Sequence, residues 1–258
     1  MKPQGRRPPG PGRDGDRQWV LKLAGSKQRK RGRRLFRRGL GLFLKAALIV
    51  ILLTCAQVAL LRFVNPPFTA GTAYEWVRHK IRSKPYHPPR RQWRPLKDIS
   101  PWIIKAVLAG EDQRFMEHYG FDFIEMQNAF RDILSDKRIR GASTITMQVS
   151  RSVFLWPDRS LLRKAAEAYY TILLELFLSK VRIMEIYLNM VDWGPGIMGA
   201  EAAAQKYFQV SSADVTPSQA ARMAAILPSP HAWSPNSPNE HLLRREKRIM
   251  KDMEKMHL

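Results

Sequence analysis

A long apolar run constrains this chain more than any other feature of its sequence. Residues 40–61 read LGLFLKAALIVILLTCAQVALL, with Lys45 as the only charge. As a helix, this run rises about 1.5 Å per residue, roughly 33 Å in all, which suffices to cross a hydrocarbon core of about 30 Å. Lys45 lies near one end, where its long side chain can reach the headgroups. The run therefore predicts a single membrane-spanning helix.

The charges beside this run predict its orientation. The formal net charge is +22, and the segment before the run is dense in Lys and Arg, opposed only by Asp14 and Asp16, whereas Arg62 follows the run. Such a charge suits nucleic acid, anionic lipid or a phosphate-bearing substrate, and the adjacent apolar run favours the membrane over nucleic acid. The basic flank predicts a single-pass protein with its N-terminus in the cytoplasm and the bulk of the chain on the other side of the membrane.

Two other interpretations of the run remain open. A cleaved signal peptide would also be apolar, but the long basic segment and the absence of a small-x-small cleavage pattern argue against it. The residues before Cys55 weakly resemble a lipoprotein signal, although Thr54 is a poor residue in that position. Cys55 is the only cysteine, which excludes an intrachain disulfide and a cysteine-based metal site.

Composition divides the chain into four parts. Residues 1–39 form a basic cytoplasmic tail, expected to be disordered because its Pro, Gly and Arg residues bury little apolar surface. The span of residues 40–61 is followed by a proline-rich linker or extended stalk over residues 62–92. Residues 93–258 then form a folded domain. Its apolar spacing is helical almost throughout, with no convincing alternating run, so the predicted fold class is mainly α.

One helix of this domain carries an unexpected carboxylate. Ser100 as N-cap and Pro101 at the first helical position predict its start, and it should close before Gly120. Helical spacing places Glu111 and His118 on the apolar face formed by Ile104, Val107, Leu108 and Phe115. A carboxylate there must be paired or have a raised pKa, which suits acid or base work. Periodicity alone slightly favours the alternative, in which Glu111 lies at the edge of the stripe and reaches water.

Four segments, in order, resemble the motifs of one enzyme family. They are EDQRFMEHYG at 111–120, GASTITMQ at 141–148, RKAAE at 163–167 and KVRIMEIYLN at 180–189, with a looser match over 199–230. This order and spacing resembles the peptidoglycan glycosyltransferases, glycosyltransferase family 51, over about residues 93–230. The resemblance implies that residues 93–258 form a lysozyme-like helical glycosyltransferase domain with a membrane-associated hydrophobic jaw. It also implies that the protein lies in the bacterial inner membrane with this catalytic domain on the periplasmic face. Because no transpeptidase-sized region follows, it points to the monofunctional biosynthetic branch of the family.

The resemblance also implies roles for residues of the first two motifs. Glu111 corresponds to the general base that takes the proton of the acceptor sugar's 4-hydroxyl, and Asp112 and His118 support that site. Four residues of the second motif are expected to contact phosphate or sugar oxygens of the substrate, namely Ser143, Thr144, Thr146 and Gln148. A helix cap is the alternative use of these hydroxyls.

Basic residues of the later segments are expected to hold a diphosphate. The resemblance assigns this to Arg151, Arg159, Arg163 and Lys164, with further attraction from Lys180 and Arg182. It makes Glu167 a second catalytic carboxylate that helps to position or neutralise the diphosphate, in some relatives through Mg or Mn. An ordinary ion pair within one helix is the alternative for Glu167. Architecture is the expected role of Glu185, Tyr187 and Asn189, and the apolar residues between 121 and 134 are expected to serve lipid contact or core packing.

Together these residues predict polymerisation of the peptidoglycan glycan strand. Glu111 would activate the acceptor hydroxyl of lipid II, which attacks the growing lipid-linked chain with inversion, forms a β-1,4 bond and releases undecaprenyl diphosphate. The sequence requires no cofactor, and cell-division or cell-wall synthesis proteins are possible partners. A membrane-anchored muramidase or lytic hydrolase is the alternative enzyme, although a hydrolase has no diphosphate for the cation cluster to hold. For a membrane-tethered scaffold or nucleic-acid-binding protein, Glu111 would be dispensable.

Overall fold

The computed structural model describes the backbone of residues 13–135, 143–158 and 160–256, and the side chains from residue 36 onward within those ranges. The chain divides into two compact units, Met1–Ala56 and Gln57–Leu258, each described here by itself.

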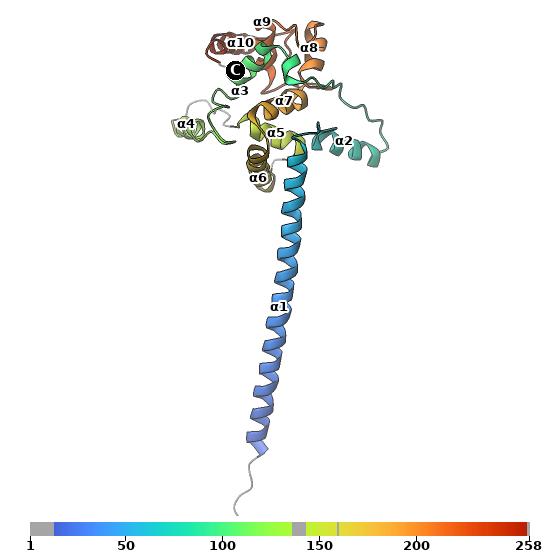
Figure 1. Ribbon diagram of the computed structural model, residues 1–258, viewed down its shortest axis with the longest axis vertical. Coiled ribbons are helices and arrows are strands. Elements are labelled where there is room, and N and C mark those ends of the chain that lie inside the picture. Colours follow the sequence, from blue (N-terminus) through green and yellow to red (C-terminus); the bar gives the residue numbers. More distant parts are fainter. Residues whose placement is uncertain (1–12, 136–142, 159, 257–258) are drawn as a thin grey trace, which may run out of the picture. The chain divides into compact units, whose positions relative to one another are not determined.

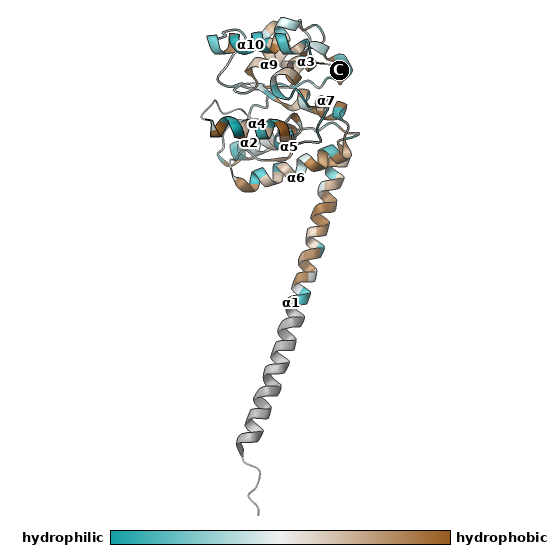
Figure 2. Ribbon diagram, turned by 90° about the vertical axis from the view of Figure 1, so that its left-hand side faces the viewer, coloured by the Kyte–Doolittle hydropathy of each residue, from teal (hydrophilic) through white to brown (hydrophobic). Residues whose placement is uncertain are grey.

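Helix α1 (Arg13–Leu60) contains the predicted span (Figure 2). Its segment Phe36–Leu60 has a mean hydropathy of 2.3, and none of its most apolar stretch is buried against protein. A lipid-facing helix has this character, since a core helix of a soluble protein would be covered. The structure therefore fits a single-pass membrane anchor.

The expected disorder of residues 1–39 differs from the structure from Arg13 onward. Helix α1 already begins there, because no proline lies between Pro11 and Pro66 and because Leu, Lys, Gln and Arg are good helix formers. Once the apolar segment is helical, each added residue extends an existing helix without a new nucleation step. Residues 1–12 lie outside the described part of the chain.

The second unit is mainly α-helical, as predicted (Figure 1). Its elements in chain order are α2 (Ala70–Ile81), a short 3-10 turn (Leu96–Asp98), α3 (Pro101–Glu111), α4 (Phe123–Leu134), α5 (Ile145–Phe154), α6 (Leu161–Phe177), α7 (Lys180–Met190), β1 (Asp192–Gly194), β2 (Ile197–Met198), α8 (Ala200–Phe208), α9 (Pro217–Ile226) and α10 (Glu240–Met253). Strands β1 and β2 form an antiparallel hairpin. The strands of this hairpin are too short to show an alternation of apolar and polar residues, which explains why the sequence contains no such pattern.

The core of the second unit consists of two groups of packed helices. Helix α3 packs against α9 and α10, and α5 packs against α6 and α7. The alanines of α9, Ala220, Ala221, Ala224 and Ala225, are all at most 1% exposed, and such small residues allow close helix packing. Most helices begin at a polar residue whose side chain accepts a backbone N–H, namely Thr69, Asp122, Thr144, Ser160, Ser179, Thr216 and Asn239.

The proline-rich linker is not an extended stalk. Between Pro67 and Pro85 the chain forms α2, which Thr69 starts with a capping box. Further along, the backbone of Arg90 joins the β-hairpin, accepting from Met198 N at 3.0 Å and donating to Gly196 O at 2.9 Å. The linker therefore belongs to the second unit.

Helix α3 ends before Phe115 and His118, which the predicted apolar face had included. Ser100 and Pro101 start the helix as expected, although the Ser100 hydroxyl donates to Val215 O at 2.9 Å and caps nothing. Glu111 is the last helical residue, so placing His118 on the same helical face was wrong. The turns that follow reach Gly120, which has a φ of +83°, and a Cβ there would lie 2.7 Å from Thr171 Cγ2. Only glycine fits this turn without strain.

Helix α4 stands at one side of the second unit with much of its apolar surface uncovered (Figure 1). The exposed residues are Phe123, Ile124, Met126, Phe130, Ile133 and Leu134, between 41% and 74% exposed. Core packing, one of the two uses expected of this stretch, is therefore wrong for these residues.

Candidate active site

Glu111 lies at the C-terminal end of α3 with its carboxylate 11% exposed. Arg245 Nη2 donates to Oε1 at 2.9 Å, and Gln148 Nε2 donates to Oε2 at 3.0 Å. Arg245 is itself fixed, because the same guanidinium donates to Gly110 O at 3.0 Å and to Ala225 O at 3.2 Å. The carboxylate is therefore held between α10 and α5, which rules out the alternative of a carboxylate reaching freely into water.

Burial raises the pKa of Glu111 above its ordinary value. The hydrogen bond from Gln148 and the charges of Arg245 and Arg151 oppose this rise, whereas Asp112 adds to it. Loss of hydration outweighs the stabilising partners, since the charged form suffers most from burial. A carboxylate of raised pKa takes up a proton more readily than an exposed one, as a general base must.

Tyr187 sets the orientation of the Gln148 amide. The Tyr187 hydroxyl, on α7, donates to Gln148 Oε1 at 3.2 Å, so the amide nitrogen faces Glu111. Tyr187 is 1% exposed, and burial together with the nearby Glu111 carboxylate raises its pKa well above the ordinary value. The phenol therefore remains a neutral donor, and α7 acts on Glu111 through α5.

Asp112 and His118 lie just behind this carboxylate and connect α3 to α5. His118 Nε2 lies 3.0 Å from Asp112 Oδ1, and Asp112 Oδ2 accepts from the backbone N of Ile145 at 2.9 Å. Both residues are buried, which fits the supporting role predicted for them. By distance, Asp122 completes a set of three possible metal ligands with them, but its carboxylate already accepts from the first turn of α4.

The residues of the second motif differ in where they point, because two of them are buried in the fold and one contacts Glu111. Thr144 is 3% exposed, caps α5 by accepting from Met147 N at 3.2 Å, and donates to Gly120 O at 2.6 Å. Thr146 is fully buried and donates to Glu175 at 2.6 Å. The helix-cap alternative is thus confirmed for Thr144, and Thr146 faces the interior. Ser143 is half-buried, and Gln148 is the residue of this motif that contacts Glu111.

Glu167 forms a second, buried charge cluster on α6. It is 1% exposed and accepts from Arg163 Nη1 and from Lys164 Nζ, both at 2.6 Å. These are pairs within one helix, as the alternative supposed, yet the burial of the carboxylate distinguishes them from an ordinary surface pair. Lys164 keeps its side chain 48% exposed, so one cation of the cluster remains available to a ligand. Arg159 lies outside the described residues.

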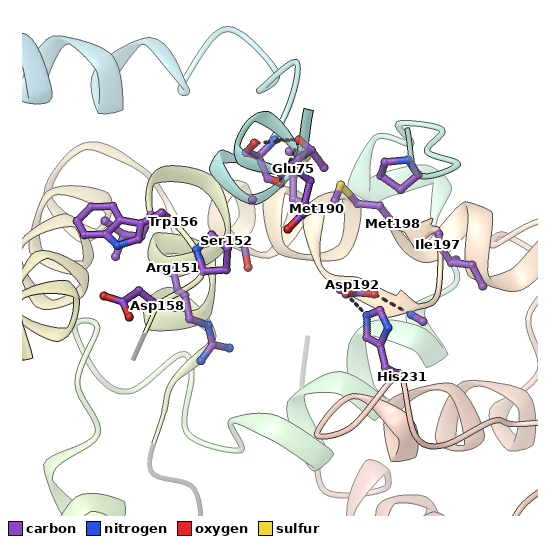
Figure 3. Close-up of a pocket in the computed structure, with 18 of the residues that line it drawn as sticks. Glu75, Arg151, Ser152, Trp156, Asp158, Met190, Asp192, Ile197, Met198 and His231 are labelled. Carbon is purple, nitrogen blue, oxygen red and sulfur yellow. Dashed lines mark hydrogen bonds and ion pairs between the residues drawn. The ribbon is translucent and has the colours of Figure 1, made fainter. Parts of the chain in front are cut away.

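Helix α5 contacts both glutamates, Glu111 through its carboxylate and Glu167 through its backbone carbonyl. Its Gln148 contacts Glu111, and the hydroxyl of its Ser150 donates to Glu167 O at 2.8 Å. Arg151, exposed at the same end of α5, interacts electrostatically with Glu111. Together with Arg163 it also lines a cavity of about 610 Å³, whose far wall carries the ion pair Asp192–His231 (Figure 3).

Two cations expected at the phosphate are used elsewhere. Lys180 donates to Glu175 at 2.8 Å and lies 4.4 Å from the centre of the Phe115 ring. Arg182 donates to Leu61 O at 2.8 Å and pairs with Glu185. Both charges are already paired within the fold and neither residue lines the cavity that holds Arg151 and Arg163, so their attraction of phosphate stays a prediction.

Sequence reasoning missed Arg245. It belongs to the run RREKR in α10, which in sequence resembles a solvated helix face and lies beyond the segments that carry the resemblance. Only its distance of 2.9 Å from Glu111 distinguishes it from the neighbouring cations. A buried carboxylate that needs a counter-ion was the one available signal.

Comparisons with known proteins identify the family. The sequence matches the protein-family model described as "Transglycosylase" over residues 78–254. A protein of Caulobacter vibrioides named "Biosynthetic peptidoglycan transglycosylase" is 44% identical over 85% of this chain and 91% of its own length. Proteins with the same name from Bdellovibrio bacteriovorus and Pseudomonas fluorescens are 42% and 43% identical, over 80% and 87% of this chain and 82% and 91% of their own lengths. With this match and with its buried, oriented Glu111, the chain belongs to the transglycosylase family of enzymes.

Proposed function

We propose that this protein polymerises the glycan strand of bacterial peptidoglycan from lipid II. The observation that carries the proposal is the buried Glu111 carboxylate, which has a raised pKa and is held by Arg245 and Gln148. The names of its relatives support the substrate class. The two substrates are lipid II as acceptor and the growing lipid-linked strand as donor.

In the proposed reaction, Glu111 accepts the proton of the acceptor sugar's 4-hydroxyl. The oxygen attacks the anomeric carbon of the donor, and the bond from that carbon to the diphosphate breaks. Attack from the opposite face inverts the α-linked donor into a β-1,4 bond, and undecaprenyl diphosphate leaves. The reaction needs a base on one face of the ring and positive charge on the other.

Arg151, Arg163 and Lys164 supply that positive charge. Arg151 is exposed at the end of α5, and the Lys164 ammonium is half-exposed beside Glu167. Negative charge grows on the diphosphate as the bond breaks, so nearby cations stabilise the transition state more than the ground state. Glu167 keeps Arg163 and Lys164 together through its two ion pairs of 2.6 Å.

A divalent cation does not fit Glu167 as it is arranged. Both carboxylate oxygens already accept from a cationic side chain, and the carboxylate is 1% exposed. Mg²⁺ prefers several free oxygen ligands in an octahedral arrangement and would face two fixed positive charges here. Mg or Mn at the diphosphate, which the resemblance implies only for some relatives, therefore enters no step of the proposed reaction.

The reaction is proposed to occur at the outer face of the inner membrane. The apolar segment Phe36–Leu60 supports anchoring, and the basic residues before it support a cytoplasmic N-terminus. The exposed apolar face of α4 supports lipid contact by the catalytic domain, because a patch of this kind is rare on a surface in water.

Purified full-length protein incubated with labelled lipid II tests the proposal. Polymer should form with the parental chain and should be abolished in Glu111→Gln, which keeps the volume of the side chain but not its basicity. This variant should still fold, as thermal unfolding would show, and should still bind lipid II. Digestion of purified peptidoglycan, with no polymer from lipid II, would favour the muramidase alternative. Substantial turnover by Glu111→Gln would remove the general base from the mechanism.

A further inference from the structure

Two cavities of the second unit share a wall. The head cavity is the one lined by Arg151 and Arg163, and beside it lies a tail cavity, also of about 610 Å³, between α2 and the segment that follows it. The residues that line both cavities are Thr72, Tyr86, Pro89 and Met198. The two cavities are therefore neighbouring parts of one surface.

The head cavity has the chemistry of an anion site. Arg151 (Figure 3) forms no salt bridge with any described residue, and Arg163, which is paired with Glu167, lines the same cavity. Three carboxylates also line the cavity, those of Glu75, Asp158 and Asp192. Asp192 is paired with His231 at 2.7 Å, and Glu75 is paired with Arg78 at 3.1 Å. Arg151 is thus the cation most available to a phosphate, and its planar guanidinium can bind two phosphate oxygens at once.

The tail cavity is mostly apolar. Its lining includes Phe68, Trp76 and Val77, whose exposed fractions are 60%, 50% and 46%. The polar groups that line it are occupied, because the Tyr86 hydroxyl donates to Thr72 O at 3.3 Å and the Arg91 guanidinium donates to Pro66 O and Pro67 O at 3.0 and 2.6 Å. A wall with occupied polar groups and uncovered aromatic side chains suits an apolar ligand.

The tail cavity begins a few residues after the predicted membrane span. The apolar segment ends at Leu60, and Pro67 and Phe68 already line the cavity. The intervening segment is fixed to α7, since Arg182 donates to Leu61 O at 2.8 Å, to Val64 O at 3.1 Å and to Asn65 Oδ1 at 2.8 Å. The cavity therefore begins within a few residues of the end of the predicted span, and the segment between them is fixed to the second unit.

We propose that the tail cavity binds the isoprene units next to the diphosphate of the lipid-linked donor, while Arg151 and Arg163 bind the diphosphate itself. This rests on the proposed function. The isoprene units between the bilayer and the diphosphate would otherwise lie in water, and covering each methylene is favourable. A cavity of about 610 Å³ has the size of a small-molecule site, so it covers only this part of a long chain.

Short polyprenyl diphosphates test the assignment as inhibitors of lipid II polymerisation by the full chain in detergent. Farnesyl diphosphate should inhibit the parental protein at least about tenfold more strongly than dimethylallyl diphosphate, because a few buried methylenes correspond to a tenfold affinity change. Trp76→Ala, which removes part of the wall, and Ala73→Phe, which fills the cavity, should both abolish that preference and leave inhibition by dimethylallyl diphosphate unchanged.

Tyr74→Ala is the matched control. Tyr74 lies on the same helix, is 46% exposed and lines neither cavity, so this variant should keep the parental preference. Thermal unfolding of all three variants checks that α2 still folds. If Trp76→Ala and Ala73→Phe both fold and both keep the preference, the tail does not bind here. Polymerisation by the parental chain is read in the same assay, so failure of the proposed function is distinguished from failure of the tail site.

A second measurement requires no turnover. Farnesyl diphosphate that carries a diazirine on its chain should label the peptide over residues 67–91, and unlabelled farnesyl diphosphate should compete, whereas farnesol and phosphatidylglycerol vesicles should not. Labelling confined to α4 would overturn the proposal. Equal competition by phosphatidylglycerol would overturn it too, because the cavity would then bind membrane lipids in general.

Discussion

The guanidinium of Arg245 donates a hydrogen bond of 2.9 Å to the Glu111 carboxylate, although 134 residues separate the two in sequence. The charge of Arg245 lowers the pKa of Glu111 against the larger opposing effect of burial. The balance between these two effects determines the pH at which Glu111 can act as a base, and so makes Arg245 a positioning residue for the proposed reaction.

Arg245→Ala should raise the pKa of Glu111 further, since an adjacent opposite charge typically accounts for about 1 to 3 pKa units. At neutral pH the rate should fall by about tenfold or more, and the loss should shrink as the pH is raised. The acid limb of the rate against pH measures this shift. Arg244→Ala is the control, because Arg244 is exposed and pairs only with the exposed Glu240 among the described residues. An unshifted acid limb in Arg245→Ala would contradict the coupling.

The parental enzyme should itself lose activity on acidification earlier than an ordinary carboxylate implies. A base must be deprotonated, and burial raises the pKa of Glu111, so activity should decline at a pH above the ordinary value of about 4.3. The free energy of unfolding should depend on pH in the opposite direction to activity. A carboxyl with a raised folded-state pKa binds its proton more tightly when folded, so its contribution falls as the pH rises through that pKa. Glu111→Gln cannot ionise and should lack this fall, as unfolding against pH would reveal.

Tyr187→Phe should reduce turnover several-fold without removing the base. The variant loses the donor that orients Gln148, so the amide can turn its oxygen towards Glu111. The lost hydrogen bond should cost about 1 kcal/mol of unfolding free energy. Tyr207→Phe loses a comparable hydroxyl bond, to Trp193 O at 2.7 Å, away from Glu111. If the two variants have equal turnover, the orientation of Gln148 does not matter for the reaction.

The helical fold and the place of Glu111 on a buried helix face could be predicted from the sequence because both depend on local patterns. Caps such as Ser160 and Ser179 fix helix starts within a few residues, and the motif around Glu111 is contiguous. Residues joined across the fold could not be predicted in this way. Arg245 reaches Glu111 from α10, and Thr146 turns inward because α5 packs on α6 and α7, which no local spacing encodes.

The contacts of Arg182 could not be predicted from the sequence either. As an isolated cation in a family-like segment it suggested phosphate binding, yet it donates to Leu61 O, Val64 O and Asn65. Arg182→Lys should keep the charge but lose the planar fork that makes these bonds, and should destabilise the domain by about 1 to 3 kcal/mol. Limited proteolysis near Phe63 would detect the released segment. Arg62→Lys, at an exposed position, should leave both measurements parental.

The Glu167 cluster gives the sharpest separation between a stabilising and a catalytic role. Glu167→Gln removes a buried counter-ion from Arg163 and should cost about 3 kcal/mol or more of unfolding free energy, besides reducing turnover. Lys164→Ala removes a half-exposed cation, so it should change stability by less than about 1 kcal/mol. If Lys164 binds the diphosphate, its loss should still reduce turnover about tenfold.

Lys255→Ala is the control for Lys164→Ala. Lys255 is 64% exposed and forms its ion pair of 2.7 Å with Asp252 within the C-terminal part of the chain. It should therefore lose a similar pair without affecting polymerisation. Lipid II polymerisation and thermal unfolding, measured on the same preparations, separate the two roles. Parental rates in both Lys164→Ala and Glu167→Gln would make the cluster a structural ion pair and would place the diphosphate elsewhere, because a cation that neutralises the leaving group cannot be removed without slowing its departure.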